Sequence, residues 1–305
     1  MTELLRGLMP GRTVELVVVR TEGDRRADEP LDRIGGQGMF VKEVQQAVLD
    51  GRADVAVHSA KDLPPLTLPG LCLGAVPARA DPRDALVGAT LDGLPTGATV
   101  ATGSARRRAQ LANARPDLRF ADLRGNMDTR LRRVGDGSAD AVVVAVAAFD
   151  RLGWSDRLTE VLAPTVCLPQ VGQGALALEC REDDAASRAV LAAADDRQAH
   201  RTLLAERSFL AAVGASCSAP VGAWAEPVGG ESLRLHAMVA SGDGRVLVRA
   251  ALAGDDPETL GRELARHLME DCGGAAVLEA VTPAPGPVTP APGPVTPPPD
   301  SGTAR

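Results

Sequence analysis

The segment Asp54-Val-Ala-Val-His-Ser-Ala-Lys-Asp-Leu-Pro64 passes from alternating apolar residues to a cluster of ionisable ones. Residues 54–58 alternate and are rich in valine, which predicts a short β-strand that ends in a loop before the prolines. The polar residues at this point are His58, Ser59, Lys61 and Asp62. In an open α/β sheet, ligands bind beyond the carboxyl ends of the strands, so these side chains are the first candidates for chemistry. A solvated loop is the alternative.

Composition sets the broad class. A chain of 305 residues with 45% hydrophobic residues can bury two or three cores, so we expect two or three domains. Aromatic residues are only 2%, which disfavours stacking on single-stranded nucleic acid, and the net charge of −7 disfavours general binding to nucleic acid or anionic membranes. No run of about 18 apolar residues predicts a membrane span, and the first residues lack a signal-peptide core.

The cysteines and histidines are too scattered for a metal site, so no metal is expected. Five cysteines without a C-x-x-C pair also do not form a disulfide framework, and a reducing cytoplasm is the simplest compartment. Cys72, Cys167 and Cys180 lie in apolar runs and are expected in the core. Cys217 instead lies in a loop of small residues, where a thiol is a candidate nucleophile or attachment point.

The first region predicts an α/β unit. Thr2–Met9 has the pattern of the last turns of a helix, and Thr13–Val19 is β-branched and apolar, which predicts a buried strand. A glycine-rich loop at 35–38 precedes a predicted helix at Met39–Asp50. Glycines before a helix suit an anion, although a plain tight turn is an equal alternative.

Arginines gather in the second region. A strand at Ala98–Ala101 is followed by a helix at Ala105–Ala114 with Ser104 as its N-cap. Arg106 and Arg107 stand in the first turn of that helix, where cations oppose the helix dipole, and such a locally unfavourable choice is typical of functional sites. Two further strands, at 118–123 and 140–146, also end near arginines: Arg124 and Arg130 after the first, and Arg151 after the second.

Residues 101–133 hold nine arginines against three aspartates. Guanidinium groups bind carboxylates and phosphates in two-pronged geometry, so the excess predicts a pocket for a ligand with several acid groups. Two alternatives remain: a nucleic-acid patch, which the lack of interleaved aromatics disfavours, and a solvated helix face. The arginines that fit a solvated face best are Arg108, Arg115, Arg132 and Arg133.

The rest of the chain predicts a hinge, a third domain and a tail. The irregular segment 168–174 and a strand at Ala175–Cys180 indicate a return crossing between two α/β lobes, which would form a cleft. A helix at Arg201–Val213, three strands (Val221–Trp224, Leu233–Val239, Val246–Leu252) and a helix at Pro257–Glu270 predict a small α+β domain. Residues 281–305 repeat Pro-Ala-Pro-Gly-Pro-Val-Thr, which predicts a disordered tail.

Six motifs in this order resemble the hydroxymethylbilane synthase (porphobilinogen deaminase) family over residues 2–280. They are Val57-His-Ser-Ala-Lys-Asp-Leu-Pro64, Asp81-Pro-Arg-Asp-Ala85, Ser104-Ala-Arg-Arg107, Leu123-Arg-Gly-Asn126, Val171-Gly-Gln-Gly-Ala175 and the loop around Cys217. The resemblance implies two α/β lobes similar to periplasmic binding proteins, with a cleft, and a third α+β domain. The implied domains are 1–77 with 175–192, then 80–168, then 197–280, followed by the tail 281–305.

The resemblance also implies a chemistry. A dipyrromethane cofactor would be held by a thioether to Cys217, and four porphobilinogen molecules would be joined head to tail with loss of ammonia. Asp62 would be the catalytic carboxylate of this cytoplasmic, monomeric enzyme. The implied cofactor contacts are Cys217, Lys61, Ser59, Ser104, Arg106, Arg107, Arg124 and Gly125. The implied substrate contacts are Arg130, Arg151, Thr102 and Gln173.

The chain departs from the family pattern at its start. Family members begin with a strand and loop that here would precede Met1, so the first lobe is expected to be truncated and its start site misassigned. The 305-residue form is then expected to be poorly soluble or inactive, because neighbouring strands would expose unpaired backbone. Gln37, where lysine is common, weakens the case for the glycine loop as an acid contact. The competing hypotheses are an inactive truncated homologue and a two-lobed polyanion-binding protein.

Overall fold

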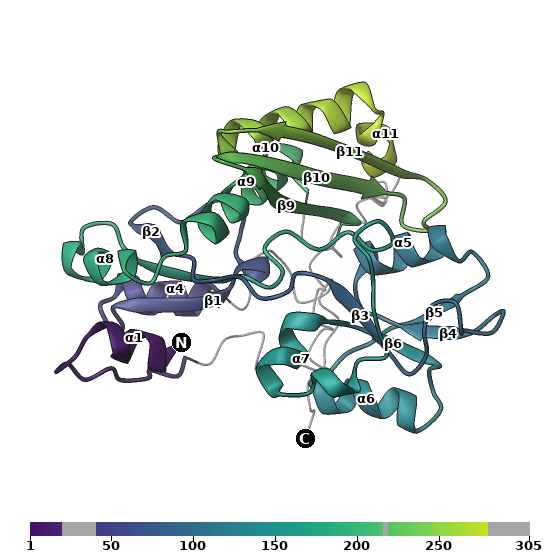
Figure 1. The fold of residues 1–305 in the computed structure, drawn as a ribbon, viewed down its shortest axis with the longest axis horizontal. Coiled ribbons are helices and arrows are strands. Elements are labelled where there is room, and N and C mark those ends of the chain that lie inside the picture. The colour runs from purple at the N-terminus through teal and green to yellow at the C-terminus, as the bar shows by residue number, and fades with distance from the viewer. Residues whose placement is uncertain (20–40, 216–218, 280–305) are drawn as a thin grey trace, which may run out of the picture.

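The computed structural model describes residues 1–19, 41–215 and 219–279, which form three β-sheets with separate helices (Figure 1). Three predictions lie outside the described residues: the glycine loop at 35–38, Cys217 itself and the tail at 281–305. The described part is a mixed α/β protein with a small α+β unit at its C-terminal end, as predicted.

The first sheet has the order β1-β8-β2 and is antiparallel throughout. Its strands are β1 (Val55–Ser59), β2 (Leu71–Ala75) and β8 (Leu176–Arg181). The helices α1 (Thr2–Leu8), α4 (Lys42–Leu49) and α8 (Ala185–Ala192) pack around it. In the register of β1 and β8, Ser59 lies opposite Leu176, so the end of β1 meets the chain where it returns to this sheet. A 3₁₀ turn at Ala60–Asp62 follows directly.

The predicted buried strand at Thr13–Val19 is wrong. This segment has no strand structure, and Leu16 and Val18 are 72% and 77% exposed. β-Branched residues favour a strand only when a neighbouring strand pairs with their backbone and a sheet face covers their side chains. None of the described strands pairs with this segment. The helix before it, in contrast, is present as predicted.

The second sheet has the order β5-β4-β6-β3-β7. Its strands are β3 (Asp84–Val87), β4 (Thr99–Ala101), β5 (Arg119–Ala121), β6 (Ala141–Ala145) and β7 (Glu160–Val161). β4 runs parallel to both β5 and β6, so these three strands end at the same edge of the sheet. Helices α5 (Ala105–Ala114), α6 (Met127–Gly135) and α7 (Val146–Leu152) each start after one of these ends, and a 3₁₀ turn follows at Ser155–Arg157.

The third sheet is the antiparallel ribbon β11-β10-β9, backed by α9 and α10. Its strands are β9 (Val221–Gly229), β10 (Ser232–Ala240) and β11 (Leu247–Gly254). Helix α9 (Arg197–Val213) starts four residues earlier than predicted, because Asp196 accepts hydrogen bonds from two backbone N–H groups and caps it. Helix α10 (Pro257–Arg266) ends earlier than predicted and continues as a π-turn at His267–Asp271, followed by α11 (Gly274–Glu279).

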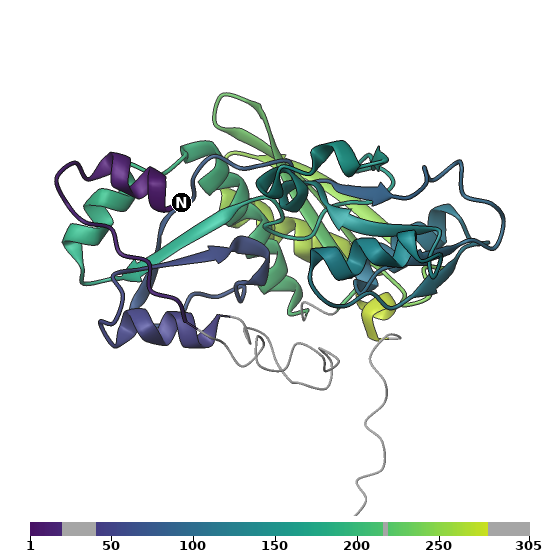
Figure 2. The ribbon, with the colours of Figure 1, turned by 90° about the horizontal axis from the view of Figure 1, so that it is seen from below.

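Two chain crossings join the first two sheets. The first leads from β2 to β3 and the second returns from β7 to β8. They lie side by side, since the Ala80 N–H donates to the Gly174 carbonyl at 3.2 Å and Arg79 Nε donates to the Gln173 carbonyl at 3.0 Å. Seen from below, the two lobes lie on either side of these crossings (Figure 2). Several of the candidate site residues line a pocket that includes part of the return crossing.

Candidate functional site

One pocket lies where the three sheets meet, and we call it the central pocket. Its walls come from the turn after β1, the start of α5, the return crossing, α9 and the start of β9. The polar residues of its wall are Lys61, Asp62, Ser104, Arg106, Gln170 and Arg207. Four of the predicted site residues, from segments about forty residues apart in the chain, are thus brought together here.

Asp62 and Lys61 lie in the 3₁₀ turn that follows β1. Loss of solvent raises the pKa of Asp62 above its usual 3.8, although the charges of Lys61 and His58 act in the opposite direction. Burial likewise lowers the pKa of Lys61, and Asp62 partly offsets this. Asp62 lines the central pocket and is exposed there, so its carboxyl group is accessible from the pocket.

Arg106 and Arg107 both bind Asp84, a residue of the Asp81–Ala85 motif for which the sequence predicted no role. Asp84 is completely buried, and its oxygens accept from Arg106 Nη1 at 2.8 Å and from Arg107 Nη2 at 2.6 Å. Burial by itself would raise the pKa of Asp84, but the two guanidinium groups outweigh it and hold that pKa far below the usual range. The carboxylate therefore fixes both arginines at the start of α5 and offsets their unfavourable place in the helix dipole.

Arg106 and Arg107 differ in how many of their guanidinium donors remain free to bind a ligand. Arg107 donates to Asp84 through Nε and Nη2 and to the Val143 carbonyl through Nη1. Arg106 uses only Nη1 within the described part of the chain, and its buried Nε and Nη2 have no hydrogen-bond partner there. Unpaired donors on a residue that is 3% exposed are costly, so Arg106 is poised to bind an acid group in the central pocket.

In the described part of the chain, the side chains of Gln173 and Thr102 make hydrogen bonds to other groups of the protein interior. Gln173 Nε2 donates to Asp84 at 2.8 Å and to the Pro82 carbonyl at 2.7 Å. Thr102 is buried and accepts from the Ser104 N–H at 3.2 Å. Ser104 caps α5 as predicted by accepting from the Arg107 N–H, although this contact is long at 3.4 Å. These residues support the arginines, and Ser104 also reaches the pocket wall.

The other predicted arginines lie around the same edge of the second sheet. Burial lowers the pKa of Arg130, and repulsion from Arg107 and Arg124 adds to this, which places the three guanidinium groups near one another. Arg130 Nε donates to the Gly125 carbonyl at 3.0 Å, and Gly125 has a φ of 92°, which favours glycine. Arg151 follows β6 and donates to the Gly174 carbonyl at 2.8 Å. Ser59 directly precedes the 3₁₀ turn that contains Lys61, and its side chain makes no capping hydrogen bond to that turn.

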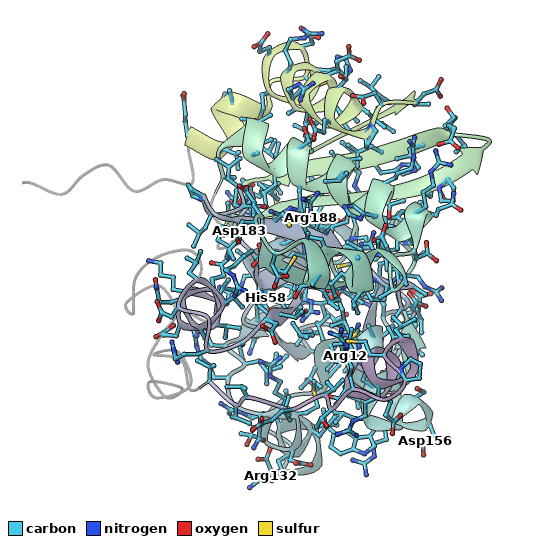
Figure 3. The ribbon with its side chains drawn as sticks, turned by 90° about the vertical axis from the view of Figure 1, so that its left-hand side faces the viewer. Arg12, His58, Arg132, Asp156, Asp183 and Arg188 are labelled. Atoms are coloured by element: carbon cyan, nitrogen blue, oxygen red, sulfur yellow. The ribbon has the colours of Figure 1, made fainter. Side chains whose placement is uncertain are left out.

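Three of the four arginines assigned to a solvated face lie there. Arg108 pairs with Asp122 and is partly exposed. Arg132 and Arg133 are exposed on α6, and Arg132 projects from the lower edge of the molecule in Figure 3. The prediction is wrong for Arg115, whose side chain is 23% exposed and donates to Asp117 and to the carbonyls of Leu91 and Leu94. Arg115 therefore holds the segment before β4 against the end of α5.

A buried polar pair beneath the site was missed by the sequence analysis. His58 Nε2 lies 3.1 Å from Glu179 Oε2, and Gln45 Nε2 donates to the same oxygen at 2.8 Å. Figure 3 shows His58 inside the first lobe. The alternation of β1 could have shown that His58 shares a face with the buried Ala56, but only the fold identifies Glu179 on β8 as its partner.

Glu206 of α9 was also missed, and it joins several parts of the molecule. Its oxygens accept from Arg79 Nη1 at 2.6 Å, from the Gly172 N–H at 2.7 Å and from the Ala225 N–H at 2.9 Å. The carboxylate is completely buried. It therefore links both crossings to the third sheet, next to the pocket wall.

The residues present fit a ligand with acid arms better than a metal. Among the described residues, no group of three or more histidines, cysteines and acids could hold a metal ion. The unpaired buried donors of Arg106 suit a carboxylate, and Ala219, two residues after Cys217 in the sequence, lines the same pocket. Within the described ranges, no helix has both the length and the apolar character to cross a membrane.

Two family models match this chain. A family model described as "Porphobilinogen deaminase, dipyromethane cofactor binding domain" matches residues 1–189, and one described as "Porphobilinogen deaminase, C-terminal domain" matches residues 200–270.

Three curated relatives are named porphobilinogen deaminase. That of Syntrophus aciditrophicus is 45% identical over 280 residues, covering 90% of this chain and 91% of its own. That of Roseiflexus sp. is 47% identical over 281 residues, covering 90% and 92%. That of Acidothermus cellulolyticus is 47% identical over 290 residues, covering 92% and 87%.

A solved structure, the probable amino-acid ABC transporter extracellular-binding protein ytmK of Bacillus subtilis, is 10% identical. It covers 63% of this chain and 76% of its own, with a TM-score of only 0.36. The family models together span most of the chain, and the relatives match it along nearly their whole length. The chain belongs to the porphobilinogen deaminase family.

Proposed function

We propose that this protein is a transferase, hydroxymethylbilane synthase, that condenses four porphobilinogen molecules head to tail and releases ammonia in tetrapyrrole biosynthesis. The observation that carries the proposal is the central pocket, where Asp62 and Lys61 of the first lobe face Arg106 of the second lobe and Ala219 near Cys217. A pocket with one carboxylate among several fixed cations suits a reaction in which positive charge develops on a ligand rich in acid groups.

Asp62 is proposed as the catalytic carboxylate. When porphobilinogen loses ammonia, its pyrrole ring becomes a cationic azafulvene, and attack by another pyrrole carbon makes a second ring cation. A carboxylate fixed beside the ring N–H groups stabilises both charges and can take up the proton that is lost when the new ring regains aromaticity. Because Asp62 is partly desolvated, its interaction with such a cation is stronger than it would be in water.

The arginines are proposed to hold the acetate and propionate arms. Arg106 offers unpaired Nε and Nη2 atoms. Arg124 and Arg130 follow the end of β5 at the same edge of the second sheet, and Arg107 adds positive charge there while it donates to Asp84. Bidentate guanidinium contacts fix a carboxylate in orientation as well as in position. Arg151, at the crossing, and Lys61 extend this group. The remaining proposed contacts are Ser59, Ser104 and Gly125. Thr102 and Gln173, which were also predicted as substrate contacts, are buried, so we propose that they act by positioning Ser104 and Asp84.

Cys217 is proposed to carry the dipyrromethane cofactor through a thioether. When bound, the cofactor supplies a terminal pyrrole carbon as the nucleophile for chain growth. Arg106 and Ser104 line the pocket from the second lobe and would orient its acid arms there. Retention of both Asp62 and a thiol for attachment favours an enzyme over a receptor that only binds polyanions.

Substituting Asp62 with asparagine tests the proposal. D62N keeps the shape of the side chain but removes its charge, so we expect the rate of ammonia release from porphobilinogen to fall by about 10²–10⁴-fold. Asp183→Asn is the matched control, because the Asp183 side chain is 88% exposed on the surface of the first lobe. Similar turnover by D62N and the control would contradict the proposed role of Asp62.

The intact mass of the purified protein separates the competing hypotheses. An adduct of dipyrromethane size that is lost in Cys217→Ser is expected for the enzyme and not for a binding protein. Ammonia release from porphobilinogen then distinguishes an active enzyme from an inactive homologue.

We also infer a cytoplasmic monomer without a nucleic-acid partner, which the net charge of −7 supports. Light scattering during size-exclusion chromatography would test the monomer.

A further inference from the structure

Arg207 on α9 is a buried cation that the family motifs above do not explain. The residue is 6% exposed and lines the central pocket together with Asp62 and Arg106. Its Nη1 atom is buried and has no hydrogen-bond partner in the described part of the chain. Its Nη2 atom makes one long contact, to Thr67 Oγ1 at 3.4 Å. The guanidinium group is therefore poorly satisfied by the protein itself.

The attraction of Glu179 does not supply the missing hydrogen-bond partner of Arg207. Glu179 attracts Arg207, but Glu179 Oε2 already accepts from Gln45 and lies 3.1 Å from His58. Burying a charged donor without a hydrogen-bond partner destabilises the folded protein. Other arginines of α9 have no such deficit, since Arg197 and Arg201 both pair with Glu231. The deficit belongs to the one position of this group that faces the pocket.

Arg207 and Arg106 line the same pocket from two different helices. Arg106 comes from α5 of the second lobe and Arg207 from α9 behind the third sheet, and each carries buried donors without a partner. Leu210 lies one turn after Arg207 on the same face of α9 and lines the same pocket. α9 ends at Gly214, and the chain returns to the pocket wall at Ala219, so the segment that holds Cys217 starts and ends beside this helix.

We infer that Arg207 of the third domain binds an acid arm of the pyrrole group anchored at Cys217, and that Arg106 of the second lobe binds the same acid arm. A carboxylate in the pocket would accept from Arg207 Nη1 and Arg106 Nη2, giving each its missing partner in charge-assisted hydrogen bonds. This inference rests on the proposed function, because it needs the cofactor. It assigns the third domain a share in binding the acid arms, in addition to the covalent link.

A thermodynamic cycle between Arg207 and the adduct tests the inference. The four proteins are the full chain, R207M, C217S and R207M/C217S, with melting temperature and intact mass as readouts. Without the adduct, R207M should not lower the melting temperature, because it removes an unpaired buried charge. With the adduct, R207M should lower the melting temperature by several degrees, or the fraction of molecules that carry the adduct should fall severalfold.

Arg197→Met is the matched control on the same helix, because the Arg197 side chain is 76% exposed and should show no coupling to the adduct. An equal effect of R207M in both backgrounds would overturn the inference. So would an R207M/C217S protein that fails to fold, since the fold itself would then require Arg207. If the unsubstituted chain carried no adduct at all, the proposed function would fail, which is a different result from a missing coupling.

Discussion

At the scale of single residues, the site contains two aspartates whose surroundings shift their pKa values in opposite directions. Asp62 is exposed to the pocket and its pKa is raised, whereas Asp84 is enclosed by two arginines and its pKa is lowered. The first is suited to exchange protons with a ligand, and the second remains a permanent anion that fixes Arg106 and Arg107. Opposite environments thus give the same side chain two roles.

The raised pKa of Asp62 predicts a pH dependence. The reaction needs the carboxylate form, so the rate should fall as the pH drops through the raised pKa, at a higher pH than an ordinary aspartate with a pKa of 3.8 would show. The pH profile of ammonia release under single-turnover conditions measures this limb. A flat profile down to pH 4 in a protein that remains folded would contradict it.

The lowered pKa of Asp84 predicts a pH-dependent stability. A group with a depressed folded pKa contributes stability above its unfolded pKa of about 3.9 and loses it as the pH falls toward the folded value. The free energy of unfolding in urea should therefore drop between pH 5 and pH 3. D84N should lose roughly 3–5 kcal/mol at pH 7, because two buried guanidinium groups lose their partner, and its stability should depend less on pH in this range.

At the scale of elements, each site residue is placed by the end of a strand. The turn with Asp62 follows β1, and the arginine group follows the parallel strands β4 and β5, which end at one edge of the second sheet. Helix α5 then starts at the Ser104 cap, so its first turn lies against the pocket. The segment Thr13–Val19 is the contrast, because it has the composition of a strand without a partner strand among the described elements.

The exposure of the segment Thr13–Val19 predicts what happens when charged side chains are introduced there. The double substitution L16K/V18K should reduce self-association at high concentration and change the melting temperature by less than a few degrees, because both side chains are largely exposed. Static light scattering and thermal unfolding measure the two effects. A large loss of stability would instead show that the segment is buried, as the sequence pattern alone predicted.

At the scale of the whole molecule, polar and apolar contacts together join the three sheets. Glu206 is completely buried and binds both crossings and β9. At the other edge of the third sheet, the exposed Arg249 donates through Nη2 to Gln110 of α5 at 3.0 Å, and Ala109 of α5 packs with Met238 of β10. Residues of all three units line the central pocket, so its shape depends on how the three sheets are held together.

Removing the Glu206 carboxylate should therefore affect the whole molecule. E206A is expected to lose roughly 3–5 kcal/mol of unfolding free energy, because Arg79 and two backbone N–H groups lose their acceptor. E206Q, which keeps one carbonyl acceptor, should lose less. Urea unfolding measures both, and Glu231→Ala on the exposed surface serves as the control. Equal stability of E206A and this control would show that the links are dispensable.

Local patterns in the sequence predicted much of this protein. The alternation before His58 and the Ser104 cap were sufficient for β1 and for α5, because strand alternation and helix capping depend on neighbours within a few residues. The arginines after successive strands predict a site for acid groups, which stays a prediction. The family motifs added the cofactor and the reaction. Only the tertiary structure determined that Asp84 pairs with Arg106, that Glu179 lies against His58 and that Arg207 reaches the pocket without a partner. These contacts join residues from distant parts of the chain, so their charges meet only when the folded sheets bring them into the same dry interior.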